Sequence, residues 1–310
     1  MLDVKRMRVL REVAAQGSFS AAAEALSYTQ SAVSQQIAAL EREAGAMLVE
    51  RGARGVRLTD AGRALVAHAD AILARLDDAE RELEAIAGLR GGRVRLVAFP
   101  SAVASIVPPA IAEFRRRHPG VELSLEPREP EEGIACLKAG ECDIAITLEP
   151  TFRPLEDDAL AKTYLIEDPM HIVLRRDHPL AASKRVRLED LADEAWVLGS
   201  LSACPDTTIF LRACAAAGFE PHIAFHSDDY TAIQGFIAAG VGVAVIPDLA
   251  LVSLREDVVV RDLAGPPPVR RVLAATTAGS RSPAPEAMVA MLQDAARAWT
   301  RHPQRLAAVA

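Results

Sequence analysis

Hydrophobic positions repeat with a helical period between residues 30 and 44. Val33, Ile37 and Leu40 recur at i, i+4 and i+7, so one face of this predicted helix packs inward. The opposite face carries hydroxyls and amides in place of the Lys and Glu of an ordinary surface helix: Gln30, Ser31, Ser34 and Gln35. Such groups hydrogen-bond to base edges and phosphates in the major groove of DNA. The pattern therefore predicts a helix that reads DNA.

Two further helical segments precede this one. The first covers residues 3–16, and a second, Ala-rich helix over residues 21–26 can be capped by Ser18 or Ser20. Thr29 can cap the helix that follows the turn. Two helices joined by a tight turn form a helix-turn-helix. Because Ser20 and Thr29 lie where these helices begin, we include both among the candidate DNA contacts.

A hairpin is predicted directly after the helix-turn-helix. Two short β-like runs, residues 47–51 and 55–58, flank a turn that contains two glycines. Arg51 and Arg54 lie at the base and tip of this predicted wing. A solvated turn with incidental arginines would have the same sequence, but beside a helix-turn-helix we expect these arginines to contact phosphate or the minor groove.

A long helix capped by Thr59 is predicted over residues 59–89. Its apolar residues follow alternating spacings of four and three over three heptads, forming an apolar seam: Leu65, Ala69, Ile72, Leu76, Ala79, Leu83 and Ile86. A helix that lies against its own domain would have a wider apolar stripe. The narrow seam therefore favours self-association, with Leu65, Ile72, Leu76, Leu83 and Ile86 as the dimerisation residues.

Beyond Gly91 and Gly92 the pattern changes to strands that alternate with helices. A first series is predicted over residues 94–99 (strand), 107–118 (helix), 121–125 (strand), 131–139 (helix) and 144–147 (strand). Strands alternating with helices predict a parallel sheet with helices on its faces. The C-terminal part is therefore expected to be of the α/β class.

A second unit of the same class follows. Its predicted strands are residues 171–174, 195–198, 223–226 and 241–246, and its helices are residues 206–217 and 230–239. A further strand over residues 270–277 and a helix over residues 284–300 come last. Spacing alone leaves open which of the two units this tail joins.

The charge distribution modifies the DNA-binding prediction. The chain of 310 residues has a net charge of −7, but residues 1–60 hold eight Lys and Arg against seven Asp and Glu, or +1, which leaves −8 for the remainder. One N-terminal unit of this charge is expected to bind DNA weakly. Tight binding then needs several copies of the chain and base-specific contacts. The need for several copies agrees with the apolar seam, which favours self-association.

Composition excludes several other classes. The sequence has no long uncharged apolar run and no apolar segment at its charged N-terminus, so we expect a cytoplasmic protein with no membrane partner. Its four cysteines are Cys136, Cys142, Cys204 and Cys214, without C-x-x-C spacing or a histidine to complete a zinc set. We therefore expect neither a metal nor a cofactor.

These segments together resemble the LysR-type transcriptional regulators. The resemblance runs in order through GSFSAAAEAL, TQSAVSQQIAALE, LVERGARGVRLTDAGRAL, RVRLVAFPS, FRRRHPGVELSL, GECDIAI and DDYTAIQGFIAAGVGVAVIP. It implies a winged helix-turn-helix (residues 1–58), a linker helix for dimerisation (59–89) and an effector domain similar to periplasmic binding proteins. The effector domain would have two subdomains, one formed by residues 92–162 and 267–300 and the other by residues 163–266.

The resemblance also implies the partners. They are double-stranded promoter DNA, a small-molecule effector, other copies of the chain in a homodimer or homotetramer, and RNA polymerase. In this family an effector bound between the subdomains shifts their closure. The closure alters the spacing of the DNA-binding pairs and therefore the bending of the DNA. Whether the protein is an activator or a repressor, and which genes it controls, stays open.

Polar and small residues mark the expected effector cleft. Ligands of doubly wound sheets bind outside the carboxyl ends of the strands, and the family binds its effector at matching positions. The candidates are Ser101, Ala102, Glu129, Thr147, Gly199, Ser200, Cys204, Asp228 and Ile246. Ser101 opens a helix whose N–H groups would favour an anion. Glu129 and its acidic neighbours indicate a cationic or neutral effector, or simply a solvated rim.

Two other functions remain to be weighed. Cys204 and Cys214 lie where the peroxide-sensing members of the family hold their reactive pair, which makes a redox sensor an alternative. Ten residues of mostly helical chain would hold these thiols roughly 15 Å apart, too far for a disulfide without refolding. A solute-binding protein or an enzyme is the alternative from another class, but the chain lacks G-x-S-x-G, Walker and H-E-x-x-H motifs.

Overall fold

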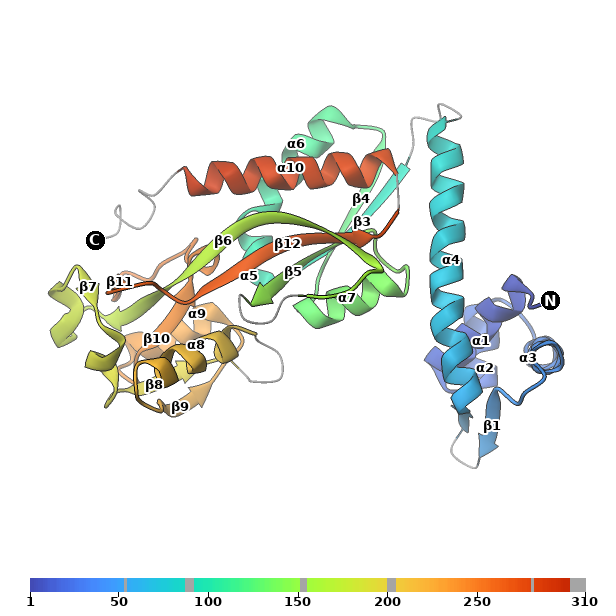
Figure 1. The fold of residues 1–310 in the computed structure, drawn as a ribbon, viewed down its shortest axis with the longest axis horizontal. Helices are drawn as coiled ribbons and strands as arrows, with labels where there is room; N and C mark the ends of the chain where they lie inside the picture. Colours follow the sequence, from blue (N-terminus) through green and yellow to red (C-terminus); the bar gives the residue numbers. More distant parts are fainter. Residues whose placement is uncertain (53–54, 87–91, 151–154, 200–204, 280–281, 302–310) are drawn as a thin grey trace. The chain divides into compact units, whose positions relative to one another are not determined.

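The structure is a computed structural model, and it describes residues 1–52, 55–86, 92–150, 155–199, 205–279 and 282–301. Within these residues the chain forms two compact units, one holding residues 1–86 and the other holding most of residues 92–301 (Figure 1). Each unit is described by itself. None of the described helices combines the length and apolar character that crossing a membrane requires.

The first unit begins with three helices, and their ends follow local sequence cues. They are α1 (Val4–Gln16), α2 (Phe19–Ala25) and α3 (Gln30–Ala44). Thr29 caps α3 by accepting a hydrogen bond from the amide of Ala32 at 3.2 Å, and Gly45 ends α3 with a φ of 67°. Val33, Ile37 and Leu40 are buried, as their spacing predicts. The apolar face of α3 therefore packs on α1 and α2 and leaves its polar face outside.

A wing and a long helix complete the first unit. Strands β1 (Val49–Gly52) and β2 (Gly55–Leu58) pair in antiparallel fashion, and α4 runs over Asp60–Ile86. Glu41 of α3 accepts hydrogen bonds from the amides of Leu48 and Val49, which fastens the wing to the helix. The wing therefore has a set position beside α3.

The start of α4 differs from the expectation. Leu65 and Ala69 are buried with the apolar residues of the three-helix core, so these two seam positions are not available for pairing with another copy. The reason is local: the first turns of α4 close the core that the short helices α1 to α3 leave open on one side. The DNA-binding unit thus extends past residue 58 into the long helix.

The second unit is built on one large mixed sheet. Its strands are β3 (Gly92–Ala98), β4 (Val121–Pro127), β5 (Ile144–Pro150), β6 (Leu160–Arg175), β7 (Arg185–Val186), β10 (Ala244–Pro247), β11 (Val258–Leu263) and β12 (Val269–Thr277). The order is β4-β3-β5-β12-β6-β11-β7, with β10 also paired to β6. Strands β3, β4 and β5 are parallel as predicted, but β12 is antiparallel to both of its neighbours. The predicted parallel series is therefore confirmed, and β12 joins it as an antiparallel strand that the local pattern did not predict.

Two long strands connect the halves of this unit. β6 pairs with β12 through Leu160–Pro169 and with β10 through Met170–Val173, so one strand belongs to both halves. The hydrophobic pattern predicted only residues 171–174 of it, because the first part of β6 is half exposed and polar. The tail β12 pairs with β5, and the last helix packs on the first half, which answers where the tail belongs.

Helices cover both faces of the first half. They are α5 (Pro100–Ala104), α6 (Val107–Arg117), α7 (Pro130–Lys138) and α10 (Pro283–Thr300). Alternate residues of β3 explain the layers: Val94 and Leu96 are buried with residues of α6 and α10, whereas Val97 lies under Gly133 of α7 (Figure 1). A Cβ at Gly133 would lie 3.4 Å from the side chain of Val97, which is an ordinary packing distance.

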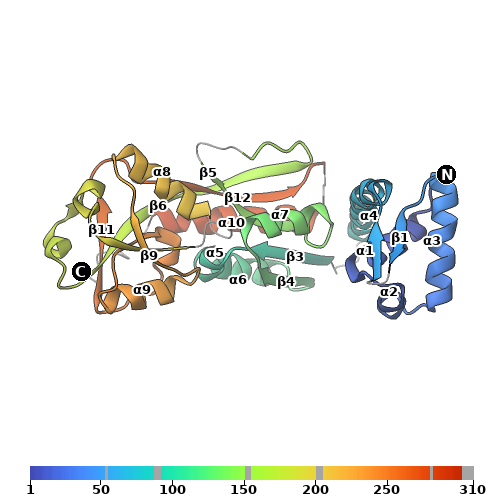
Figure 2. The ribbon, with the colours of Figure 1, turned by 90° about the horizontal axis from the view of Figure 1, so that it is seen from below.

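The second half holds its own small sheet. β8 (Ala195–Leu198) and β9 (His222–His226) are parallel, with helices α8 (Pro205–Ala216) and α9 (Tyr230–Ala238) beside them (Figure 2). Three short 3₁₀ helices, η1 (Pro179–Ala182), η2 (Leu188–Leu191) and η3 (Asp248–Ala250), complete it. Trp196 and Phe210 meet at 4.6 Å between ring centroids in its core. Helices α8 and α9 both begin after the carboxyl end of a strand, the edge where a ligand is expected.

Candidate DNA-reading face and effector pocket

The polar face of α3 is open to solvent. Gln30, Ser31 and Gln35 are exposed, and Ser34 is half-buried. Gln36, one position further, faces α1 instead, because its side-chain oxygen accepts a hydrogen bond from Nε of Arg6 at 3.2 Å. The exposed residues therefore form one stripe of hydroxyls and amides on a helix that is fixed by its other side.

The remaining candidate DNA contacts surround this stripe. Ser20 is exposed in the first turn of α2, and Thr29 is exposed while its hydroxyl caps α3 and lies 3.1 Å from that of Ser31. The side chain of Arg51 and the whole of Arg54 lie outside the described residues. The face thus has hydrogen-bonding groups on both helices of the helix-turn-helix.

A buried ionic cluster joins the two halves of the second unit. Arg270 of β12 is 2% exposed and donates from Nε to Asp168 of β6 at 2.7 Å and from Nη1 to Asp206 of α8 at 2.9 Å. Its Nη2 donates to Oγ of Ser101 at 2.6 Å, and its guanidinium lies 5.1 Å from the centre of the Phe99 ring. One arginine therefore binds α5 of the first half and α8 of the second. We call Arg270, Asp168, Asp206 and Ser101 the arginine cluster.

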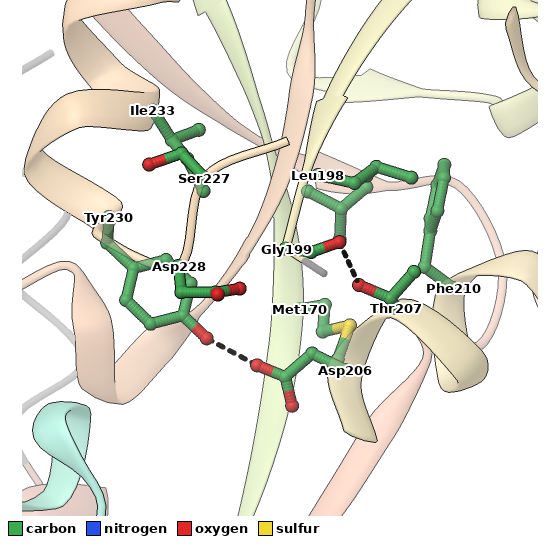
Figure 3. A pocket seen from close by; sticks show the side chains of 11 residues that line it. Met170, Leu198, Gly199, Asp206, Thr207, Phe210, Ser227, Asp228, Tyr230 and Ile233 are labelled. Carbon is green, nitrogen blue, oxygen red and sulfur yellow. Dashed lines mark hydrogen bonds between the residues drawn. The ribbon is translucent and has the colours of Figure 1, made fainter. Parts of the chain in front are cut away.

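A small pocket, about 20 Å³ in volume, adjoins this cluster in the second half. It lies between the starts of α8 and α9 (Figure 3). Its lining comprises Met170, Leu198, Gly199, Asp206, Thr207, Phe210, Ser227, Asp228, Tyr230, Ile233 and Val245. Tyr230 donates from its hydroxyl to Asp206, and Thr207 donates to the carbonyl of Gly199 at 2.9 Å. Asp206 is thus shared by the arginine cluster and the pocket.

Electrostatic coupling extends from the cluster to the rim. Burial raises the pKa of Asp168 to about 6, although Arg270 and the amide of Leu249 lower it. Burial alone would lower the pKa of Arg270, but Asp206 and Asp168 raise it well above its usual value. Burial also raises the pKa of Glu129, and the charges of Asp206, Asp228 and Glu132 raise it further. The charges of Asp206, Asp168, Glu129 and Arg270 therefore influence one another.

Comparison with known proteins identifies both units. The profile of the bacterial regulatory helix-turn-helix protein, lysR family, matches residues 4–63, and that of the LysR substrate binding domain matches residues 87–297. This chain is a LysR-type transcriptional regulator. It is 32% identical over 281 residues to the probable HTH-type transcriptional regulator LrrA of Synechococcus elongatus, which covers 90% of this chain and 92% of that protein.

Solved structures agree on the fold. A full-length OxyR variant from Pseudomonas aeruginosa has a TM-score of 0.75 at 24% identity, with 96% of this chain and 95% of that chain covered. Full-length CbnR, crystallised in complex with its target DNA, has a TM-score of 0.65 at 21% identity, with 95% and 100% covered. The regulator therefore combines a DNA-binding domain with an effector-binding domain.

The structure of this LysR-type regulator separates the candidate effector residues into groups. Gly199 and Asp228 line the pocket, and Glu129 is coupled to it electrostatically. Ser101 does not line it: Ser101 is 3% exposed and its hydroxyl accepts from Arg270. Our expectation of an anion at this serine is therefore not supported, because the helix it opens has only five residues and an arginine already occupies its hydroxyl.

The other candidates are buried or undescribed. Ala102, Thr147 and Ile246 are buried and are not part of the pocket lining. Ser200 and Cys204 lie outside the described residues. Small residues at strand ends were thus over-interpreted, since several of them pack under the helices that follow.

Sequence reasoning missed the most strongly coupled residues of the site. Asp206 and Tyr230 were assigned only to helices and Arg270 only to a strand, and Asp168 was assigned to no element. A signal existed for Arg270: two adjacent arginines in an otherwise apolar strand must point to opposite faces, so one of them enters the protein. Which carboxylates would meet it depends on contacts across 64 and 102 residues.

The buried environment of Cys214 argues against a redox sensor. This cysteine of α8 is buried in the core, and burial raises the pKa of its thiol to about 12. A thiol with such a pKa is almost entirely protonated near neutral pH, whereas a peroxide sensor needs a thiolate. Cys214 is therefore a packing residue in this regulator.

The exposed part of the apolar seam begins after Ala69. Ile72, Leu76 and Leu83 are 38%, 44% and 66% exposed, respectively. The side chain of Ile86 lies outside the described residues. These exposed side chains at heptad spacing form a row on α4 that does not pack into the core of the DNA-binding unit.

Proposed function

We propose that two or four copies of this regulator bind promoter DNA by inserting α3 into successive major grooves. The observation that carries this proposal is the exposed stripe of Gln30, Ser31, Ser34 and Gln35 on a helix that is anchored by its apolar face. Ser20, Thr29, Arg51 and Arg54 would add phosphate contacts. A protein with this function works in the cytoplasm and is not an enzyme.

A mobility-shift titration tests the recognition face. Replacing Gln30 with Ala should reduce the preference for the promoter over a scrambled site by about 10-fold, because a base-edge contact is worth about 1–3 kcal/mol. Gln36→Ala is the matched control, since Gln36 faces α1 and should leave the preference unchanged. An unchanged preference in the Gln30 variant would mean that another face reads the DNA.

Dimerisation through α4 is the second part of the proposal. Because the DNA-binding unit carries little net positive charge, tight binding requires two linked units, and the exposed seam of Ile72, Leu76 and Leu83 offers the surface for pairing. RNA polymerase would then meet the assembled regulator on the DNA.

Leu76→Glu should weaken the dimer by about 100-fold or more, because each of two symmetric copies loses a buried leucine worth roughly 1.5–3 kcal/mol. Sedimentation equilibrium over a range of concentrations measures this change. Ala67→Glu, on the same helix outside the seam, serves as control. Equal dissociation constants for both variants would place the dimer interface elsewhere.

Effector control is the third part. The pocket opens beside the arginine cluster, which binds both halves of the effector domain, so a ligand that contacts Asp206 can change how the halves are held together. Such a change would alter the spacing of the DNA-binding pairs and the contact with polymerase.

A further inference from the structure

A buried histidine at the junction of the two halves has a carboxylate at each of its ring nitrogens. His171 of β6 is 9% exposed. Its Nδ1 lies 3.1 Å from Oδ1 of Asp262 of β11, and its Nε2 lies 3.6 Å from Oδ1 of Asp248 of η3. At 3.6 Å the second contact is too long for a hydrogen bond. Nε2 is therefore a buried polar atom without a hydrogen-bond partner among the described residues.

A neutral ring cannot satisfy both contacts of His171. Neutral imidazole has one N–H, so in either tautomer the other nitrogen presents a lone pair to a carboxylate oxygen. The imidazolium has two N–H groups and can donate to Asp248 and Asp262 together. Burial lowers the pKa of His171, but the two carboxylates outweigh burial and raise this pKa above its ordinary value. The site therefore keeps the ring protonated to a higher pH than water does.

Asp248 extends the contact to the first half of the effector domain. Its Oδ2 accepts a hydrogen bond from Nε1 of Trp299 of α10 at 2.6 Å, so one carboxylate connects His171 with the last helix. Leu249, the next residue of η3, is buried in the core of the first half with residues of α6 and α10. η3 is thus a segment of the second half that packs into the first, and Asp248 contacts both halves.

Other charged or titratable groups on the elements around His171 have partners of their own. Strand β10 and helix η1 carry no charged residue. Arg185 of β7, which is opposite Asp262 in the strand register, is exposed to solvent. Hydrogen bonds or ion pairs to other groups engage Arg261 of β11, Tyr230 of α9, Arg270 and Arg271 of β12, and Arg297 of α10.

Asp168 is a second titratable group that touches η3. Its Oδ1 accepts from the amide of Leu249 at 3.0 Å, and burial raises its pKa to about 6. A test of His171 therefore has to separate the titration of the imidazole from that of this carboxylate.

We propose that protonation of His171 regulates how firmly the two halves of the effector domain are joined. The protonated ring donates to Asp262 and Asp248 and so holds η3 against β6. The neutral ring releases one of the two carboxylates, and η3 is then held less firmly. This control needs no ligand, so it acts in addition to the proposed effector control.

Fluorine NMR of Trp299 tests the coupling in the full-length protein. The chain has two tryptophans, Trp196 and Trp299, so labelling with 5-fluorotryptophan gives two resonances, which Trp299→Phe assigns. The Trp299 resonance should shift with pH, with a midpoint above the ordinary histidine pKa of about 6.5. His171→Gln should remove this transition, whereas His302→Gln, three residues beyond Trp299 in the sequence, should leave it unchanged. An unchanged transition in the His171 variant, or none in the wild type, would overturn the proposal.

Asp262→Asn gives a second test, which does not require the His171 variant to fold. The side chain of Asp262 is 59% exposed, so its replacement should be tolerated. The midpoint of the Trp299 transition should move to lower pH, because the imidazolium loses one of its two acceptors. Asp190→Asn is the matched control, since it removes the same charge from η2, where Asp190 pairs with Arg187. The same midpoint in the Asp262 variant as in the wild type would contradict the proposal.

Thermal unfolding separates this role from ordinary packing. Both tryptophans lie in the effector domain, so Trp fluorescence reports on its unfolding. A group whose pKa is raised in the folded state stabilises fully below its unfolded pKa, and this contribution is lost as pH rises through the folded value. The melting temperature of His171→Gln should therefore fall below that of the wild type by about 2–4 °C more at about pH 6 than at about pH 9. An equal difference at both pH values would mean that His171 only fills space.

Discussion

Replacing Arg270 with Ala should lower the free energy of unfolding of the effector domain by about 3–5 kcal/mol, because it leaves buried carboxylates without their cation. Asp168 is 1% exposed and Asp206 8% exposed, so water can replace little of what Arg270 provides. Urea denaturation of the full-length protein, followed by Trp fluorescence, measures the loss. Arg271→Ala is the matched control: Arg271 points to the other face of β12, is largely exposed and lies 3.8 Å from Glu167. It should change stability by less than about 0.5 kcal/mol.

The loss of unfolding free energy in the Arg270→Ala variant should also depend on pH. Burial already raises the pKa of Asp168 to about 6, and loss of Arg270 raises it further. An acid whose pKa is higher in the folded state than in the unfolded state loses stability as pH rises towards the folded value. The loss of unfolding free energy should therefore be smaller at about pH 5.5 than at about pH 8. A loss below about 1 kcal/mol at both pH values would show that the cluster does not stabilise the domain.

Gly62→Ala should destabilise the DNA-binding unit by about 3 kcal/mol and abolish promoter binding, because an added Cβ has no space. A Cβ at this position would lie 2.0 Å from the carbonyl oxygen of Leu48 and 3.2 Å from the side chain of Leu58. The first turn of α4 would have to move away from the strands, and the amide of Thr59 would lose its 3.0 Å hydrogen bond to the same carbonyl.

Thermal unfolding and fluorescence anisotropy with promoter DNA measure both effects. Ala61→Ser is the control, since Ala61 is exposed on the same helical turn and should change stability by no more than about 0.5 kcal/mol. Wild-type affinity in the Gly62 variant would mean that the wing tolerates a shift of α4 and is not part of the DNA-binding surface.

The helix-turn-helix was predictable in detail because its determinants are local. Thr29 and Gly45 define α3 by cap chemistry that involves only neighbouring residues, and the predicted range of 30–44 coincides with the helix. The dimerisation seam was predicted less well. Heptad spacing cannot show that Leu65 and Ala69 are already used by the core of their own domain.

The candidate effector site was predictable only in part. Strand ends led to Gly199 and Asp228, and both line the pocket, because parallel strands bring their carboxyl ends to one edge of a sheet. The same rule did not show that Ser101 is buried and bonded to Arg270, because β12 returns antiparallel beside β5 and carries Arg270 to this serine.

The sequence alone determined the class of this protein. Periodicity, caps and the hydroxyl-and-amide face of one helix are properties of short segments, and they predict a DNA-binding unit, a pairing helix and a two-part α/β unit. The resemblance to the LysR-type regulators implied the regulator function and the effector role. Only the tertiary structure decided which charges meet in the cleft. Arg270, Asp168 and Asp206 are distant along the chain, and the register of β12 against β6 is set by the packing of whole sheets. Local sequence patterns cannot predict contacts between residues that are so distant along the chain.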